Sequence, residues 1–216
     1  MVKMPVVMAG VHVKACKKSK EQLKMSDLPL ILDATAGFRN MWFNKNDPDT
    51  LYMDVRTNRE LKAASESYGK QKNGKGGRKY KATTPTMAAS YCFLPFKDES
   101  FQLINVDPPH LYKLGKSSLF RKKYGGLEIG TWQLELKLMA QELWRVLKPG
   151  GLLTFKWCDR DIGYKEVLRL FPAKPRYGQF GAHGKASSTA WFTYLKPPVE
   201  VKEVCLLACN NLRSEL

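Results

Sequence analysis

A short apolar run that ends in an acid and two prolines limits the folds open to this chain. The run Phe101–Val106 (FQLINV) leads directly into Asp107-Pro108-Pro109-His110. Continuous apolar character over this length is typical of a strand that is covered on both faces. Two successive prolines lack N–H donors and cannot continue a strand ladder. The strand is therefore expected to end here and to present carbonyl and carboxylate oxygens at its carboxyl end.

Further apolar runs have the length of strands, and helical spacing lies between two of them. Leucine, methionine and valine side chains recur three and four residues apart from Leu136 to Leu147, and the pattern stops at the turn sequence 148–151. Alternating strands and helices predict right-handed crossovers, a mostly parallel sheet, and ligands at the carboxyl ends of its strands. The other expected strands are Leu28–Ala34, Thr50–Val55, Leu152–Trp157, Trp191–Leu195 and Val199–Leu207.

Composition adds a strong bias towards anionic partners. The 216 residues include 36 Lys and Arg against 20 Asp and Glu, a net charge of +16. This length suits one domain, and we divide the chain into a basic N-terminal segment, 1–27, and a single domain, 28–216, with a mobile basic glycine-rich loop at about 56–81. The basic excess favours DNA, RNA or another polyanion. A basic protein that is merely soluble is the alternative.

Other sequence features bear on the cellular compartment and on metal binding. No apolar run reaches the roughly 18 residues of a membrane span, and the N-terminal residues do not resemble a cleaved signal. The five cysteines are scattered, with no CxxC pair and no neighbouring histidine. We therefore expect reduced thiols, no metal site, no membrane association and an intracellular, cytoplasmic protein.

Two more acids follow predicted strands. Asp33 begins the sequence Asp33-Ala34-Thr35-Ala36-Gly37, in which small residues and a glycine allow a ligand to approach the backbone closely. Asp54 lies 21 residues later at the next strand end, where a carboxylate can accept both hydroxyls of a ribose. This spacing is shared by nicotinamide and S-adenosylmethionine sites. An ordinary turn and a solvated acid remain alternatives for the two positions.

The DPPH tetrapeptide suggests a specific chemistry. The Asp107 carboxylate and the Pro108 carbonyl are placed to accept hydrogen bonds from an exocyclic amine, and the His110 ring to stack on the base that carries it. An aryl amine is a weak nucleophile because its lone pair is delocalised into the ring. Acceptors on its two hydrogens help the nitrogen to pyramidalise and to attack a methyl group that is held nearby.

The order DATAG, Asp54, DPPH, LKPGG resembles the class I S-adenosylmethionine-dependent methyltransferases over roughly Leu28 to Leu195. DPPH is similar to the (D/N)PP(Y/F/W/H) box of the nucleic-acid amino-methyltransferases, including the adenine-N6 type. The resemblance implies a Rossmann-like α/β fold with a mostly parallel seven-stranded sheet, helices on both faces and an antiparallel last strand. It implies S-adenosyl-L-methionine as cofactor.

By position, the resemblance also implies residue roles. Asp33, Ala34 and Gly37 would line the methionine part of the cofactor, Asp54 would bind the ribose, and Asp107, Pro108 and His110 would hold the target amine and its ring. Many relatives have an acid that contacts the adenine amino group, and Ser90 or the Tyr91 backbone would take its place here. The basic residues expected to grip substrate phosphates are Lys113, Lys116, Arg121, Lys122, Lys123, Lys75, Arg78 and Lys79.

Together these features predict methyl transfer from S-adenosylmethionine to an exocyclic base amine, adenine N6 above all, in DNA or RNA. The alternatives are a methyltransferase for protein amides or small molecules, and a catalytically silent methyltransferase-like subunit that binds nucleic acid for a partner protein. Trp42, Phe43 and Trp144 are expected to belong to the core rather than to stack on a ligand.

Overall fold

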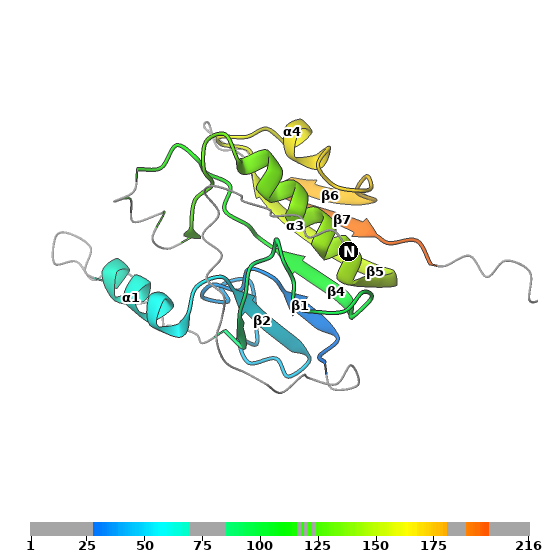
Figure 1. Ribbon diagram of the computed structural model, residues 1–216, viewed down its shortest axis with the longest axis horizontal. Helices are drawn as coiled ribbons and strands as arrows, with labels where there is room; N and C mark the ends of the chain where they lie inside the picture. The colour runs from blue at the N-terminus through cyan, green and yellow to red at the C-terminus, as the bar shows by residue number, and fades with distance from the viewer. Residues whose placement is uncertain are drawn as a thin grey trace, which may run out of the picture.

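Seven strands form one mixed sheet in the order β3-β2-β1-β4-β5-β7-β6 (Figure 1). The computed structural model describes residues 28–69, 85–115, 118, 121, 124–180 and 189–198. The neighbouring strands from β3 to β5 pair in parallel, and β7 pairs antiparallel with both β5 and β6. The predicted α/β architecture, with seven mostly parallel strands and an antiparallel last strand, is confirmed. The strands are β1 (Ile31–Asp33), β2 (Thr50–Asp54), β3 (Met87–Ala88), β4 (Phe101–Val106), β5 (Leu147–Cys158), β6 (Tyr177–Phe180) and β7 (Thr189–Leu195).

The central strands match the apolar runs, and the strands at the two edges do not. β4 has the predicted bounds, whereas β3 and β6 were not predicted. β3 has only two residues, and β6 (YGQF) contains a glycine and an exposed Tyr177, so neither shows an apolar pattern. The strand expected at Val199–Leu207 lies outside the described residues.

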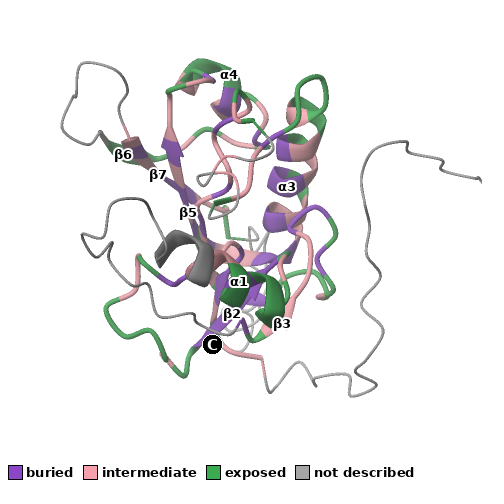
Figure 2. Cartoon of the chain, turned by 90° about the vertical axis from the view of Figure 1, so that its left-hand side faces the viewer, coloured by how far each residue is buried: buried purple, intermediate pink, exposed green. Residues whose placement is uncertain are grey.

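Helix α3 (Trp132–Val146) covers one face of the sheet (Figures 1 and 2). Its buried side chains follow the predicted spacing of three and four. The turn predicted at 148–151 is wrong, because β5 begins at once with Leu147 and includes these residues. The Lys196 ammonium donates to the carbonyls of Trp144 (3.1 Å) and Leu147 (2.7 Å), which satisfies acceptors that the helix end leaves open. The buried face of α3 consists of Leu136, Met139, Ala140, Leu143 and Val146.

Helix α1 (Asn58–Gly69) corrects the prediction of a loop at 56–81. Thr57 and Glu60 form a capping box at its start: the Thr57 N–H donates to the Glu60 carboxylate at 2.8 Å, and the Glu60 N–H contacts the Thr57 hydroxyl at 3.4 Å. The Glu, Leu, Lys and Ala residues that follow favour a helix. The helix shows no apolar face in the sequence: among the side chains described from 58 to 65, only Leu61 is buried and most of the others are charged or small. Residues 70–81 lie outside the described part.

The connection from β1 to β2 also departs from strict alternation of strands and helices. Residues 34–49 cross between the two parallel strands through turns alone, and they include Gly37 at φ +49° and Arg39 at φ +51°. Pro48 and several Asn and Asp residues favour turns over a helix here. The crossover therefore runs without a helix from the carboxyl end of β1 back to the amino end of β2, where the Asp49 carbonyl accepts from the Ile31 N–H at 3.0 Å. A short helix, α4 (Tyr164–Leu168), follows β5.

None of the helices in the described ranges is both long and apolar enough to cross a membrane.

Candidate functional site

The three predicted acids meet at the switch point of the sheet. β1 pairs with β2 on one side and with β4 on the other, so the chain leaves β1 between two strands whose connections run in opposite directions. Asp33 ends β1, Asp54 ends β2, and Asp107 follows β4. In open parallel sheets, ligands bind in the crevice at this position. The Asp107 N–H donates to the Thr35 hydroxyl at 2.7 Å and so connects the segments that follow β4 and β1.

Asp33 is fully buried beneath the turn that follows β1. Its carboxylate accepts hydrogen bonds from the Thr35 N–H (3.1 Å) and from the Trp42 indole N–H (2.6 Å). Burial raises the pKa of Asp33 from 3.8 to about 7, although both hydrogen bonds oppose the shift. Asp33 is therefore poised between neutral and ionised near pH 7, and a cationic ligand group would favour the ionised form.

Trp42 is a site residue that the sequence did not identify. It was expected in the core, yet it is only half-buried and bonds to Asp33, while its ring packs edge-on against Tyr52. Phe43, also expected in the core, is fully exposed. The absence of a helix at 34–49 explains both differences, because the helical positions assumed for these residues do not exist. Trp144 does pack against the core.

Asp54 has both carboxylate oxygens engaged. Its Oδ1 accepts from the Arg56 N–H (2.8 Å) and from Arg56 Nε (2.9 Å), and its Oδ2 accepts from the Gly37 N–H and Arg56 Nη2, both at 2.9 Å. Gly37 needs its left-handed backbone for this contact, and a Cβ placed on it would lie 3.5 Å from Arg56 Nη2 and 3.8 Å from Asp54 Oδ2. A ligand hydroxyl must therefore replace donors of Arg56.

The segment that carries Ser90 and Tyr91 lies beside the end of β2. The Ala89 N–H donates to the Asp54 carbonyl at 3.0 Å. The Ser90 hydroxyl accepts from the Cys92 N–H at 3.2 Å, and the Tyr91 hydroxyl is hydrogen-bonded to Glu135 of α3. The Tyr91 ring is buried and bound to α3, so only its backbone and Ser90 remain available to a ligand.

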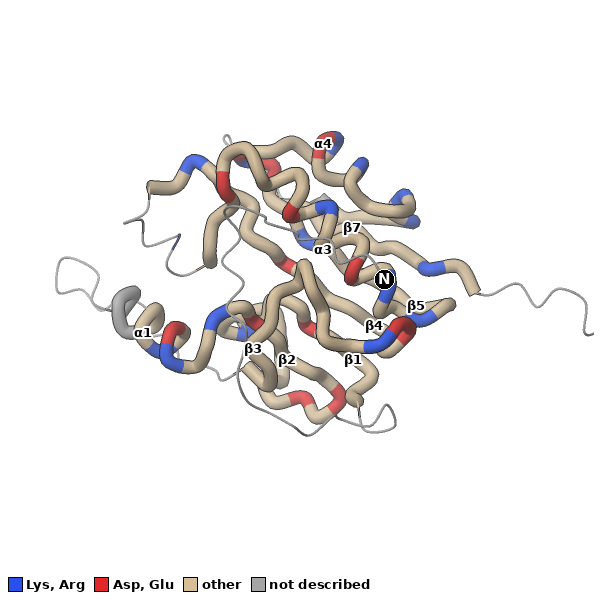
Figure 3. Tube along the Cα trace, in the orientation of Figure 1, with Lys and Arg blue, Asp and Glu red and all other residues tan. Residues whose placement is uncertain are grey.

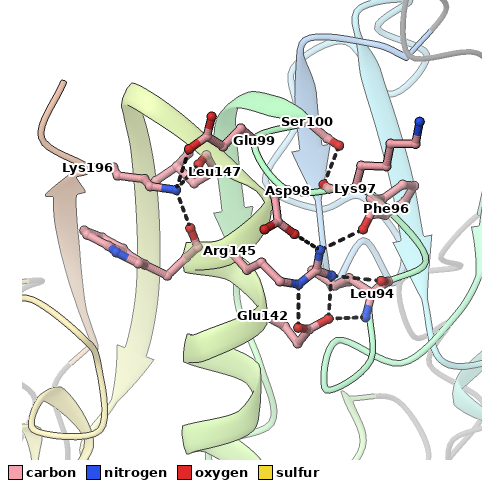
Figure 4. Close-up of polar contacts among 11 residues, drawn as sticks. Leu94, Phe96, Lys97, Asp98, Glu99, Ser100, Glu142, Arg145, Leu147 and Lys196 are labelled. Carbon is pink, nitrogen blue, oxygen red and sulfur yellow. Dashed lines mark hydrogen bonds and ion pairs between the residues drawn. The ribbon is translucent and has the colours of Figure 1, made fainter. Parts of the chain in front are cut away.

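Arg145 holds the following loop in place, as Figure 4 shows. Its guanidinium donates to the carbonyls of Leu94 (3.1 Å) and Phe96 (2.8 Å) and pairs with the carboxylates of Glu142 and Asp98. Glu142 in turn accepts from the Leu94 N–H at 2.8 Å. These contacts fix the loop on α3 and leave its N-terminal end beside the β2 carboxyl edge.

The DPPH segment lies on the β4 side of the switch point. Asp107 Oδ2 accepts from the Lys156 ammonium of β5 at 2.6 Å. His110 lies edge-on to the buried ring of Trp157, with centroids 6.0 Å apart. Burial lowers the pKa of His110, although the nearby Asp107 carboxylate opposes this shift. The imidazole is therefore mainly neutral at pH 7.

Two neighbouring segments support the DPPH backbone. Asp161 accepts from the N–H groups of Tyr112 (3.0 Å) and Lys113 (3.1 Å), and the Trp157 indole donates to the Ile162 carbonyl at 2.9 Å. Gly125 has φ +80°, and a Cβ there would lie 2.9 Å from Pro109 Cγ. A glycine is thus required where the chain returns past the prolines.

The basic residues divide into three groups. Lys113 is exposed. Arg121 donates to Glu128 and to the Leu114 carbonyl, so it holds its own segment in place in addition to its predicted contact with substrate phosphates. Along the described trace, acidic and basic residues are interspersed (Figure 3). The remaining predicted positions, Lys116, Lys122, Lys123, Lys75, Arg78 and Lys79, lie outside the described residues, as does most of the basic excess.

Within the described ranges, no group of three or more His, Cys, Asp or Glu side chains is arranged to hold a metal ion. Cys92 and Cys158 are free thiols.

No protein-family model and no curated protein matches the sequence. Among solved structures, the chain is similar to a mutant of the 16S rRNA (adenine(1408)-N(1))-methyltransferase from Catenulisporales acidiphilia, with 13% identity, a TM-score of 0.44, and 83% of this chain and 95% of that one covered. The antibiotic-resistance methyltransferase Kmr has 16% identity, a TM-score of 0.44, and coverages of 83% and 96%. The cyclase SpnF has 13% identity, a TM-score of 0.45, and coverages of 81% and 79%. Likeness at this level concerns the path of the chain, so the chemistry of the site has to be derived from its own residues.

Proposed function

We propose that the protein is an S-adenosylmethionine-dependent methyltransferase that acts on an exocyclic base amine, adenine N6 in the first place, of DNA or RNA. The observation that carries this proposal is the meeting of Asp33, Asp54 and the DPPH segment at the switch point of the sheet. One side of that crevice has acids suited to a ribose and a cationic amine. The other side has the acceptors for a substrate amine.

The residues of the first side fit the cofactor. The buried Asp33 carboxyl suits the cofactor's amino group, and the Asp54 oxygens suit the ribose hydroxyls once Arg56 gives way. Ala34 and the left-handed turn at Gly37 leave room for the methionine part, while Ser90 or the Tyr91 backbone borders the adenine. When bound, the cofactor supplies a methyl group on a sulfonium, which an amine nitrogen attacks as the carbon–sulfur bond breaks.

The DPPH segment prepares the amine for that attack. Asp107 Oδ1 and the Pro108 carbonyl accept the two amine hydrogens, since Asp107 Oδ2 is already bonded to Lys156. Localising the nitrogen lone pair towards the methyl group lowers the activation barrier. Holding both reactants in place supplies much of the remaining rate acceleration. The methylated amine then releases its extra proton to solvent. The His110 ring contacts the base, which has to leave its stack to reach this depth.

The net charge of +16 supports a polyanionic substrate. Exposed Lys113, directly beyond DPPH, is placed to contact a phosphate next to the flipped base. The Lys113→Gln variant should flatten the log–log salt dependence of nucleic-acid binding by about 0.7–0.9. Lys165→Gln, at an exposed position on α4, is the matched control. An unchanged slope in the Lys113 variant would remove this residue from the interface.

The decisive experiment is incubation with methyl-labelled cofactor and separate pools of DNA, RNA and protein, followed by digestion to nucleosides and amino acids. Label in N6-methyladenosine or its deoxy form supports the proposal. Label in a protein amide would identify the alternative methyltransferase. Cofactor binding without transfer to any pool would favour the silent nucleic-acid-binding subunit, whose partner protein would then have to be found.

A further inference from the structure

Lys156 is a half-buried lysine of β5 that points to the DPPH carboxylate. Its Nζ lies 2.6 Å from Asp107 Oδ2, and the two side chains are only 26% and 23% exposed. The same Nζ lies 5.7 Å from the centre of the Trp191 ring, and Trp191 is its cross-strand partner on β7. A side chain that starts from a central strand and lies against an aromatic ring has less freedom than a surface lysine. The ion pair is therefore part of the framework of the crevice.

This contact leaves the two oxygens of Asp107 in different states. Oδ2 is occupied by Lys156, whereas Oδ1 accepts no hydrogen bond from any residue in the described ranges. The Asp107 backbone is fixed as well, since its N–H donates to Thr35. Because Oδ2 and the backbone are both held in place, Oδ1 has a defined direction towards an incoming hydrogen-bond donor.

We propose that Lys156 is a positioning residue that orients the Asp107 carboxylate towards the substrate amine. This inference rests on the proposed function. Lys156 makes no hydrogen bond or ion pair with Asp33 or Asp54, so its effect is confined to the acceptor side. Its charge has the same sign as the charge that develops on the amine during transfer. It therefore assists by geometry rather than by charge stabilisation, and a guanidinium at this position should replace it in part.

The test measures cofactor affinity by calorimetry and single-turnover methyl transfer on the nucleic acid found in the labelling experiment. Lys156→Met should lower the transfer rate about 10- to 100-fold, because a poorly directed carboxylate loses the productive geometry. The dissociation constant of the cofactor and the thermal midpoint of its complex should stay near the wild-type values. Lys156→Arg should recover most of the rate. Lys165→Met, an exposed lysine on α4, is the control and should behave as wild type.

A double-mutant cycle separates positioning from a direct contact with substrate. If Lys156 acts through Asp107, adding Lys156→Met to Asp107→Asn should cause little further loss. Additive losses, or a wild-type rate in Lys156→Met, would overturn the role of Lys156 while the function stands. An equal loss of cofactor affinity and rate would also overturn it, because the variant would then disturb the whole crevice. A wild-type protein that transfers no methyl group to nucleic acid would overturn the proposed function and this inference together.

Discussion

Asp54 and Asp107 offer a comparison within one crevice. Each lies at the carboxyl end of a parallel strand, and each pairs with a basic side chain, Arg56 or Lys156. Asp54 is 4% exposed and accepts four hydrogen bonds over both oxygens. Asp107 has a side chain that is 23% exposed, with one oxygen bonded and the other open to a ligand. The same residue type therefore forms a closed, self-satisfied site on one side and a half-open one on the other.

This difference affects the free energy that a ligand gains from each carboxylate. A ribose at Asp54 has to exchange with the Arg56 donors, so the gain from its hydrogen bonds is reduced by the contacts that are lost. An amine at Asp107 finds an oxygen that is already directed and has no internal donor. Substitutions on the two sides should accordingly separate binding from chemistry.

The largest effect is expected at Asp107. Asp107→Ala should reduce methyl transfer by about 10²–10³-fold, because it removes a preorganised acceptor of the amine. Cofactor affinity should remain close to wild type. Rapid-quench transfer assays and calorimetry measure the two quantities, with Asp49→Ala at an exposed position as control. A wild-type transfer rate in Asp107→Ala would refute the role of DPPH.

The next effect is expected at Asp54. Asp54→Ala should weaken cofactor binding by about 1.5–3 kcal/mol through the loss of a charged acceptor, whatever happens to the chemical step. Arg56→Met tests whether Arg56 competes with the cofactor, because the variant leaves the buried Asp54 carboxylate without its guanidinium. Its thermal midpoint should fall without cofactor, and the stabilisation on adding cofactor should exceed that of wild type. A smaller stabilisation than wild type would mean that Arg56 assists binding instead of competing with it.

Asp33 provides a pH test on the cofactor side. Its carboxyl releases a proton near pH 4 in the unfolded chain and near pH 7 in the folded protein, so the folded state binds more protons between these values. Its contribution to the free energy of unfolding is therefore present below pH 4 and is lost, by a few kcal/mol, as the pH rises to about 7. Chemical denaturation from pH 4 to 8 should show this decline in wild type relative to Asp33→Asn. If the free energy of unfolding depended on pH in the same way in both proteins, the raised pKa of Asp33 would be excluded.

The smallest effect is expected at Gly125. A methyl group there would press on Pro109 and would require an unfavourable positive φ, at a cost of about 1 kcal/mol or more. Gly125→Ala should lower transfer several-fold through displacement of the DPPH backbone, with cofactor affinity retained. Gly130→Ala has a similarly positive φ but an open environment, so it reports the backbone cost alone. Equal transfer rates in the two variants would show that contact with Pro109 has no part in catalysis.

Helix α1 and the connection at 34–49 are the regions where the structure differs from the sequence-based prediction. The charged residues of helix α1 predict a loop, because Leu61 alone is buried among its described side chains, 58–65, although Thr57 and Glu60 carry a capping signature. Trp42 was assigned to a helix that the turns at 34–49 replace. In both cases the signal is local: the capping box and helix-forming residues for α1, and Pro48 with several Asn and Asp residues for the turns at 34–49.

Apolar periodicity and proline restrict the backbone locally, so the central strands, helix α3 and the place of Asp33, Asp54 and DPPH at strand ends can be predicted from the sequence. The side chains that complete the site come together only in the folded protein. Lys156 lies 49 positions from Asp107, and Gly125 lies against Pro109 through a return of the chain. Such contacts depend on strand order and register, which bring β5 beside β4, and no local pattern encodes them. The raised pKa of Asp33 has the same origin, since burial is a property of the assembled fold.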